Sequence, residues 1–326
     1  MALLEAELNT TFDSQKQAFQ LKFAAGLLNP FSGMNVSVRL GQLALNVLAR
    51  WPLKALPPKP ESGLCYLTIV GRNHWLLLRE SLFSLYRSWK QLPSVTVVSD
   101  GTWSATDFQP VFSWWPGKLE ILSREEIISD AGAAGERELE QYAQASAWGL
   151  KLASIVLLAR REPVLFVDAD ILWFADPADL FGPADLWSKP RGVGEIHCYQ
   201  NRDLALRFCP KVLEPPFVNG SILALHGEFL PPDMLRAMVH EALADPKDGT
   251  FEQTIIASAV HNGAGLLPRK TSLVAFDDID RFRYRNMRRE GFYSRHYVNW
   301  MRHLFYRDAL RLRWRSVLTP NYYPSK

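Results

Sequence analysis

The 326-residue sequence predicts an α/β fold in which a mixed sheet is flanked by helices. Two observations carry this prediction. Residues 64–98 have the pattern strand, helix, strand, which is the unit of a parallel sheet with a right-handed crossover. The apolar run Val164–Val167 is typical of a strand buried on both faces. Parallel strands bring their carboxyl ends to one edge, so polar side chains that follow them are expected to meet there.

The elements are expected in a regular order along the chain. The strands are expected at Leu64–Val70, Ser94–Val98, Lys118–Leu122, Val164–Val167 and Phe217–Leu225. The helices are expected at His74–Trp89, near Glu125, at Glu136–Ala159, Pro232–Ala244 and Glu252–Val260, with a polar loop at Ser129–Gly135.

Three parts are predicted in the chain. Residues 1–60 form a helical extension that ends in a proline-rich linker, residues 61–280 form the α/β domain, and residues 281–326 form a basic segment. One helix of the extension is amphipathic, and its apolar face carries Leu40, Leu43, Ala44, Val47, Leu48 and Trp51. That face either packs against the α/β domain or lies on an anionic membrane surface.

Composition narrows the class of protein. A hydrophobic content of 48% supports a sizeable core, and a net charge of +3 gives no argument for a nucleic-acid partner. The three cysteines, Cys65, Cys198 and Cys209, form no Cys-x-x-Cys pair and are typical of reduced thiols. Glu5 and Glu7 stand where a signal peptide is basic, and no uncharged stretch approaches the roughly 18 to 20 residues of a membrane span. We therefore expect a cytoplasmic protein, with peripheral contact at the inner face of the membrane as an alternative.

Asp168 and Asp170 directly follow the buried strand Val164–Val167. Two hard oxygen donors at the end of such a strand suit Mg²⁺ or Mn²⁺ that holds a substrate phosphate, although a solvated acidic turn gives the same pattern. Polar residues also follow the first two strands, and we expect them at the same edge. They are Arg72, Asn73 and Asp100.

The last 46 residues are strongly basic, with Glu290 and Asp308 as the acidic counterparts of a series of arginines. The series consists of Arg281, Arg283, Arg285, Arg288, Arg289, Arg295, Arg302, Arg307, Arg311, Arg313 and Arg315. Such a segment forms a solvated basic face, closes over a diphosphate or contacts acidic lipid.

The sequence resembles the nucleotide-sugar-dependent glycosyltransferases of the GT-A fold in three features. They are the α/β start, Asp168-Ala169-Asp170 and the following Trp173–Pro177. The closest likeness is to the group that contains glycogenin and the bacterial lipopolysaccharide galactosyltransferases, over most of residues 63–310. The resemblance implies a hexosyltransferase that uses a nucleoside-diphosphate sugar, expected to be a UDP-sugar, with Mn²⁺ or Mg²⁺ on the diphosphate. It implies retention of anomeric configuration and a carbohydrate or lipid-linked glycan acceptor.

The resemblance also assigns roles to individual residues. The C-terminal element of the group, His-x-x-Gly-x-x-Lys-Pro-Trp, is similar to residues 296–304, which makes His296 the third metal ligand and Arg302 the diphosphate contact. Asn299 replaces the glycine, and His303 competes as a ligand. The remaining implied contacts are Lys151, Arg72, Asn73 and Asp100 for the donor, and Asn219, Glu252 and Gln253 for the reacting sugar.

Two rival functions share the central residues. A phosphatase of the haloacid-dehalogenase type would use Asp168 as nucleophile and Asp170 as acid or base. That family carries its motif on the first strand, followed two residues later by Thr or Val, where this chain has Leu172. A non-catalytic adaptor built on a degenerate transferase fold is the other alternative, because the C-terminal element is imperfect.

Overall fold

The computed structural model describes residues 33–181, 187–195, 199–268, 271–274, 291–298 and 301–318. Cys198, Asn299 and the five arginines from Arg281 to Arg289 lie outside these residues. The chain divides into two compact units. The smaller unit comprises Met1–Trp51, Phe276–Arg285 and Asn299–Lys326, and the larger unit comprises Pro52–Ala275 and Asn286–Val298.

The larger unit is built on a seven-stranded sheet of order β3-β2-β1-β4-β7-β6-β8. Its strands are β1 (Glu61–Val70), β2 (Leu92–Ser99), β3 (Leu119–Leu122), β4 (Val164–Val167), β6 (Arg191–Glu195), β7 (Phe217–Leu225) and β8 (Gly265–Leu267). The strands β1 to β4 are parallel, whereas β7 is antiparallel to β4 and to β6. The expected mixed sheet and α/β class are therefore confirmed.

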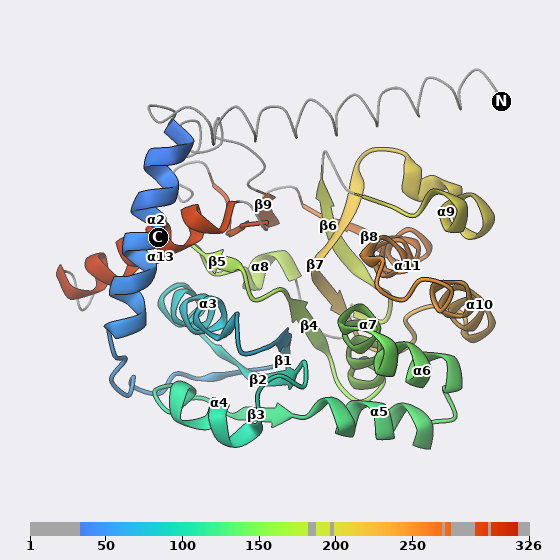
Figure 1. Cartoon of the computed structure of the whole chain (residues 1–326), viewed down its shortest axis with the longest axis horizontal. Helices are drawn as coiled ribbons and strands as arrows, with labels where there is room; N and C mark the ends of the chain where they lie inside the picture. The colour runs from blue at the N-terminus through green and yellow to red at the C-terminus, as the bar shows by residue number, and fades with distance from the viewer. Residues whose placement is uncertain are drawn as a thin grey trace. The chain divides into compact units, whose positions relative to one another are not determined.

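Helices cover both faces of this sheet (Figure 1). They are α3 (Trp75–Ser88), α4 (Ala105–Phe112), α5 (Arg124–Ala133), α6 (Arg137–Ala145), α7 (Ala147–Ala159), α8 (Ala178–Phe181), α9 (Arg202–Phe208), α10 (Pro232–Ala242) and α11 (Gly249–Asn262), with the 3₁₀ turn η2 (Pro210–Leu213). Alternate side chains of β1 enter different cores, because a strand directs successive side chains to opposite faces. Cys65 and Leu67 pack with α5, α6, α7, α10 and α11, whereas Tyr66 packs with α3 and α4.

Two predictions about the middle of the chain were wrong. The single helix expected at Glu136–Ala159 is broken into α6 and α7 at Ser146, whose backbone is extended. The Ser146 side chain accepts a hydrogen bond from Gly149 N and so caps the start of α7. The loop expected at Ser129–Gly135 is largely helix, because a capping box at Ser123 starts α5 and the chain turns only at Gly135, where φ is +78°.

A second, three-stranded sheet joins distant parts of the larger unit. Its order is β5 (Ile171–Trp173), β10 (Ser294–His296) and β9 (Ser272–Val274). Two serines of α3 hold β5 in place: Ser84 Oγ accepts from Trp173 N at 2.8 Å, and Ser88 Oγ donates to Trp173 O at 3.0 Å. Because β10 pairs antiparallel with β5, this sheet brings a C-terminal segment beside the residues that follow β4.

The described part of the smaller unit is a pair of helices, α2 (Gly33–Arg50) and α13 (Arg302–Leu318). They meet where Gly41 lies against the backbone of His303. Of the apolar face predicted for α2, Ala44 and Leu48 are buried, whereas Leu40, Leu43 and Val47 are exposed. Among the described helices, none combines the length and the apolar character needed to cross a membrane.

Candidate metal and donor site

Asp168 and Asp170 lie just beyond the carboxyl end of β4, as the sequence predicts. Asp168 N donates to Ser221 O at 2.8 Å, so the pairing of β4 with β7 continues to this residue. The backbone oxygen of Asp170 accepts from Tyr297 N at 3.0 Å, which ties it to the end of β10. The Asp170 side chain is buried, whereas that of Asp168 is 29% exposed. One carboxylate therefore faces the interior and the other is open to solvent.

His296 approaches both carboxylates through the pairing of β10 with β5, in which it lies opposite Ile171. Its Nε2 atom is 3.2 Å from Asp170 Oδ1 and 4.0 Å from Asp168 Oδ2. Burial alone would lower the pKa of His296, but the carboxylates of Asp170 and Asp168 outweigh it and the pKa is raised. In the part of the chain that the structure describes, its Nδ1 atom is buried without a hydrogen-bond partner.

These three side chains fit a divalent metal ion. Each offers one ligand atom, and the ligand atoms lie within 4.8 Å of one another. Two carboxylate oxygens with one imidazole suit Mn²⁺, and the carboxylates also suit Mg²⁺. His303, the rival ligand, instead packs against Gly41 in the smaller unit.

Lys151 is a buried cation on α7 between two carboxylates. Its Nζ atom is 3.2 Å from Asp168 Oδ1 and 3.1 Å from Glu252 Oε1, and it lies 4.7 Å from the centre of the Phe166 ring. Burial opposes the charged form, but the two carboxylates together raise the pKa of Lys151 above its ordinary value. Burial raises the pKa of Glu252 to about 6 against the opposing effect of Lys151. The ammonium group therefore stays charged beside the Asp168 carboxylate.

Asn219 and Gln253 occupy the β7 side of the site. Asn219 is buried on β7, and its Oδ1 accepts from Ser221 N at 2.9 Å. Gln253 Nε2 donates to Val218 O at 2.8 Å, which fixes α11 to the same strand. A side chain at Gly220 would meet the Gln253 amide oxygen at 3.2 Å, so glycine leaves room for this contact. Their contact with a sugar stays a prediction.

Arg72, Asn73 and Asp100 lie where β1 and β2 end. The Asp100 carboxylate accepts from Thr102 N at 2.9 Å, and Thr102 Oγ1 accepts from Arg72 N at 2.9 Å. A Cβ atom at Gly71 would fall 1.9 Å from Asp100 Oδ2, so the two strand ends approach closely there. Sequence reasoning missed Thr102, although Asp-Gly-Thr is a typical turn in which the Asp side chain binds the backbone two residues on.

Arg302, the expected diphosphate contact, is the first residue of α13 and belongs to the smaller unit. Its contact with a donor stays a prediction. That prediction rests on the resemblance of residues 296–304 to the C-terminal element of the glycosyltransferase group, in which the cation six residues after the His holds the diphosphate.

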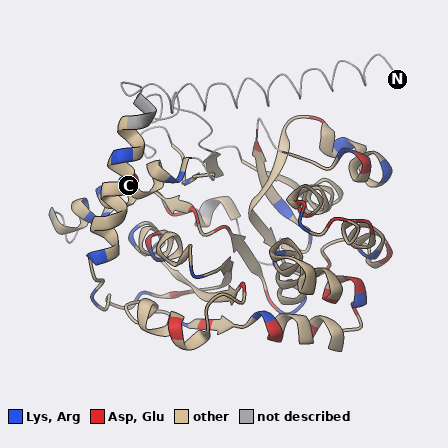
Figure 2. Ribbon diagram, in the orientation of Figure 1, with Lys and Arg blue, Asp and Glu red and all other residues tan. Residues whose placement is uncertain are grey.

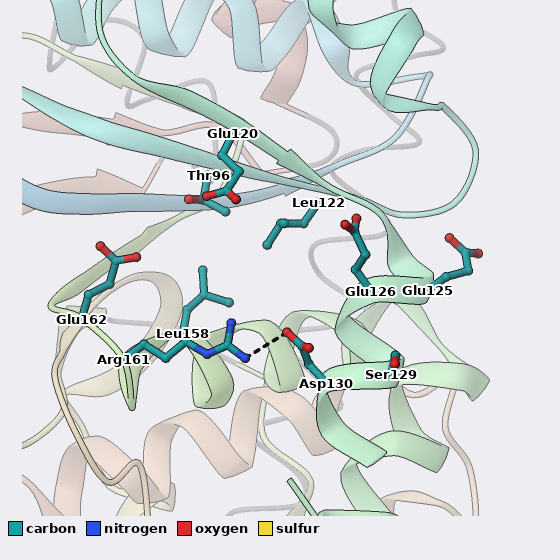
Figure 3. A pocket seen from close by; sticks show the side chains of 10 residues that line it. All are labelled: Thr96, Glu120, Leu122, Glu125, Glu126, Ser129, Asp130, Leu158, Arg161 and Glu162. Atoms are coloured by element: carbon teal, nitrogen blue, oxygen red, sulfur yellow. Dashed lines mark hydrogen bonds and ion pairs between the residues drawn. The ribbon is translucent and has the colours of Figure 1, made fainter. Parts of the chain in front are cut away.

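A separate cavity of about 430 Å³ lies beside β2 and β3 (Figure 3). None of the predicted site residues lines it. Its charged lining is mostly acidic, and its arginine, Arg161, is paired with Asp130. The carboxylates around it are Glu120, Glu125, Glu126, Asp130 and Glu162. Such a lining repels phosphate, so this cavity does not suit a nucleoside diphosphate.

No protein-family model matches the sequence, and no curated protein matches it. Several solved structures are similar to the chain. Galactosyltransferase LgtC, solved in complex with donor and acceptor sugar analogs, has 13% identity and a TM-score of 0.48, with 77% of this chain and 99% of that chain covered. The bifunctional glycosyltransferase WbbM has 12% identity and a TM-score of 0.46 over 80% of this chain. The glycosyltransferase GlyE of Streptococcus pneumoniae has 13% identity and a TM-score of 0.45 over 83% of this chain. This chain covers 53% of WbbM and 66% of GlyE.

Proposed function

We propose that the protein is a metal-dependent glycosyltransferase that moves a sugar from a nucleoside-diphosphate sugar, expected to be a UDP-sugar, to a hydroxyl acceptor. The observation that carries this proposal is the convergence of Asp168, Asp170 and His296 at the end of β4, with Lys151 bonded to Asp168. The carboxyl ends of strands in an open α/β sheet are where such folds bind their ligands. The motif likeness around Asp168-Ala169-Asp170 supports the choice of glycosyl transfer over other phosphate chemistry.

The site supplies positive charge, which is what this reaction requires. Negative charge develops on the diphosphate as the bond to the sugar breaks. Mn²⁺ or Mg²⁺, held by Asp168, Asp170 and His296, would supply Lewis-acid stabilisation of that charge. Lys151 holds the Asp168 carboxylate in place and keeps a cation beside it, and we assign Arg302 the grip on the diphosphate.

The remaining assignments concern the nucleotide and the sugar of the donor, and the acceptor. Arg72, Asn73 and Asp100, at the ends of β1 and β2, would contact the nucleotide. Asn219, Glu252 and Gln253 would line the reacting sugar, and we expect retention of configuration. The acceptor would be a carbohydrate or a lipid-linked glycan. Cys65 and Cys209 are unpaired thiols, which is consistent with a cytoplasmic location.

The phosphatase alternative fits the site less well. Its nucleophile would be Asp168, and the contact of 3.2 Å from Lys151 Nζ to Asp168 Oδ1 would keep that carboxylate ionised in either enzyme, so it does not separate the two functions. The motif, however, follows β4 rather than the first strand. The adaptor alternative predicts binding without turnover and is distinguished by the experiment below.

The test uses the full chain with Mn²⁺ and UDP, followed by a panel of UDP-sugars. We expect UDP to raise the melting temperature only when Mn²⁺ is present, and we expect slow donor hydrolysis that EDTA abolishes. Asp170→Ala should reduce hydrolysis at least about a hundredfold, because charge stabilisation of this kind is typically that large. Asp233→Ala, at an exposed aspartate of α10, is the matched control and should behave as the parent.

Each alternative has its own outcome in this test. Turnover by Asp170→Ala at the parent rate would refute the metal-site assignment. Release of phosphate from sugar phosphates without need of UDP would support the phosphatase. A Mn²⁺-dependent shift with UDP but no hydrolysis of any donor would support the adaptor.

A further inference from the structure

The helix pair of the smaller unit exposes an apolar stripe. On α2 the exposed side chains Val36, Leu40, Leu43 and Val47 recur at the spacing that places residues on one face of a helix. Leu43 is 60% exposed, and Leu40 is 49% exposed. A face of this kind is normally covered by an apolar partner, because burying one leucine side chain contributes about 1.5–3 kcal/mol.

The second helix adds to the same outer surface. Trp314 of α13 is 61% exposed and Val317 is 60% exposed. Trp314 follows His303 by eleven positions, which is close to three full turns at 3.6 residues per turn. Both residues therefore lie on nearly the same side of α13. His303 is the residue that Gly41 of α2 contacts, so α2 lies on the side of α13 that carries Trp314. The stripe lies on the face of α2 opposite Gly41. It therefore points away from α13, in the same direction as the side of α13 that carries Trp314.

This surface is also strongly basic. The described residues of α2 include Arg39 and Arg50 and no acidic residue, as Figure 2 shows for this helix. The helix α13 carries five arginines, of which Arg311 and Arg315 are exposed and Arg313 is buried, and one acidic residue, Asp308, whose side chain is largely covered. The Asp308 carboxylate is already bonded to Arg307 and Arg311. The outer surface therefore presents apolar side chains among an excess of positive charge.

We infer that this surface docks on a membrane that contains anionic lipid. The apolar side chains of α2 and Trp314 would enter the boundary between headgroups and acyl chains, and the exposed arginines would contact lipid phosphates. A second copy of the chain fits less well, because it would place arginines opposite arginines. The inference rests on the smaller unit and does not depend on the proposed transferase activity.

The test measures sedimentation of the full chain with phosphatidylcholine vesicles that contain or lack phosphatidylglycerol. The protein is expected to sediment with the anionic vesicles only, and less as salt is raised, because each arginine near such a surface contributes about 1 kcal/mol that salt screens. Leu40→Glu should weaken binding at least about tenfold, the factor that corresponds to losing the burial of one leucine. The matched control is Leu206→Glu on α9 in the larger unit, where Leu206 is 47% exposed, and it should bind as the parent.

A second variant separates docking from folding. Arg39→Gln combined with Arg50→Gln changes two exposed side chains of α2 and should weaken binding while melting as the parent does. The inference is overturned if the parent ignores anionic vesicles, or if Leu40→Glu binds them as well as Leu206→Glu. Light scattering provides the other outcome. If the parent is a dimer and the Leu40→Glu variant is a monomer, the apolar stripe would be assigned to contact with a second copy of the chain instead.

Discussion

Lys151 is the residue on which the charge balance of the site depends. It is buried and contacts Asp168 and Glu252, so each charge has an opposite charge within 3.2 Å. The desolvation of a buried charge is costly unless a partner remains, and removing one partner leaves the other uncompensated. This arrangement explains how a carboxylate such as Glu252 can be fully buried beside the candidate metal site.

We predict that Lys151→Met destabilises the larger unit by about 3 kcal/mol, because the buried Glu252 carboxylate and the partly exposed Asp168 carboxylate then lie without their cation. Glu252→Gln should cost less, since Lys151 retains Asp168. The double variant should be more stable than Lys151→Met, and urea unfolding of all four proteins measures the coupling.

The exposed pair Arg207 and Glu241 provides the control for this cycle. Arg207→Met should change the free energy of unfolding by less than about 1 kcal/mol, as is usual for surface ion pairs. Simple addition of the two single effects in the double variant would show that Lys151 and Glu252 are not coupled.

At the scale of elements, the site depends on pairings that join distant parts of the sequence. The strand β4 brings Asp168 to the sheet edge, and β10 brings His296 to it through β5. The apolar run before it predicted Asp168, and the resemblance of residues 296–304 to the C-terminal element of the glycosyltransferase group predicted His296. They did not reveal the three-stranded sheet, because its strands are only three residues long and carry no clear alternation.

The contact between α2 and α13 depends on the absence of a side chain at Gly41. A Cβ atom there would lie 2.3 Å from His303 O and 2.7 Å from His303 Cα, and backbone atoms cannot move aside easily. We predict that Gly41→Ala destabilises the helix pair by about 1–3 kcal/mol through overpacking. Faster protease cleavage within α2 and earlier thermal unfolding would report this loss.

The neighbouring exposed residue supplies the control, since Gln42→Ala should change stability by no more than about 0.5 kcal/mol. In an uncrowded helix, Gly to Ala normally stabilises by about 0.5–1 kcal/mol. A more stable Gly41→Ala protein would therefore show that the two helices do not meet at this residue.

At the scale of the whole molecule, local sequence patterns predicted individual strands and helices, but they did not predict which distant segments pair. The apolar runs and helical spacing were enough to predict β1, α3, β2 and β7, because each is encoded within its own residues. The antiparallel position of β7 beside β4 comes from pairing between distant segments, which no local pattern contains. The exposure of Leu43 on α2 likewise depends on where α13 lies.

The packed sheet also determines how stability should depend on pH. Burial raises the pKa of the Cys65 thiol to about 11 from an ordinary value of 9.0. It also raises the pKa of Tyr66 to about 12 and that of Tyr142 further above its ordinary value. An unfolded chain releases these protons at lower pH than the folded chain does. Stability is therefore expected to fall as the pH rises above 9.

Cys65→Ala isolates the thiol contribution to this fall. Between pH 9 and 11 the folded parent holds a proton that the unfolded chain has largely released, so the parent loses about 1.9 kcal/mol over this interval, out of the total of about 2.7 kcal/mol that corresponds to two pKa units. The free energy of unfolding of the variant should fall by that much less over the same interval. At neutral pH the variant is expected to be less stable than the parent, because the substitution leaves a cavity in the core. Urea unfolding at a series of pH values measures both proteins, and the two tyrosines cancel because both proteins contain them. Parallel curves from pH 9 to 11 would show that Cys65 ionises as readily in the folded chain as in the unfolded one.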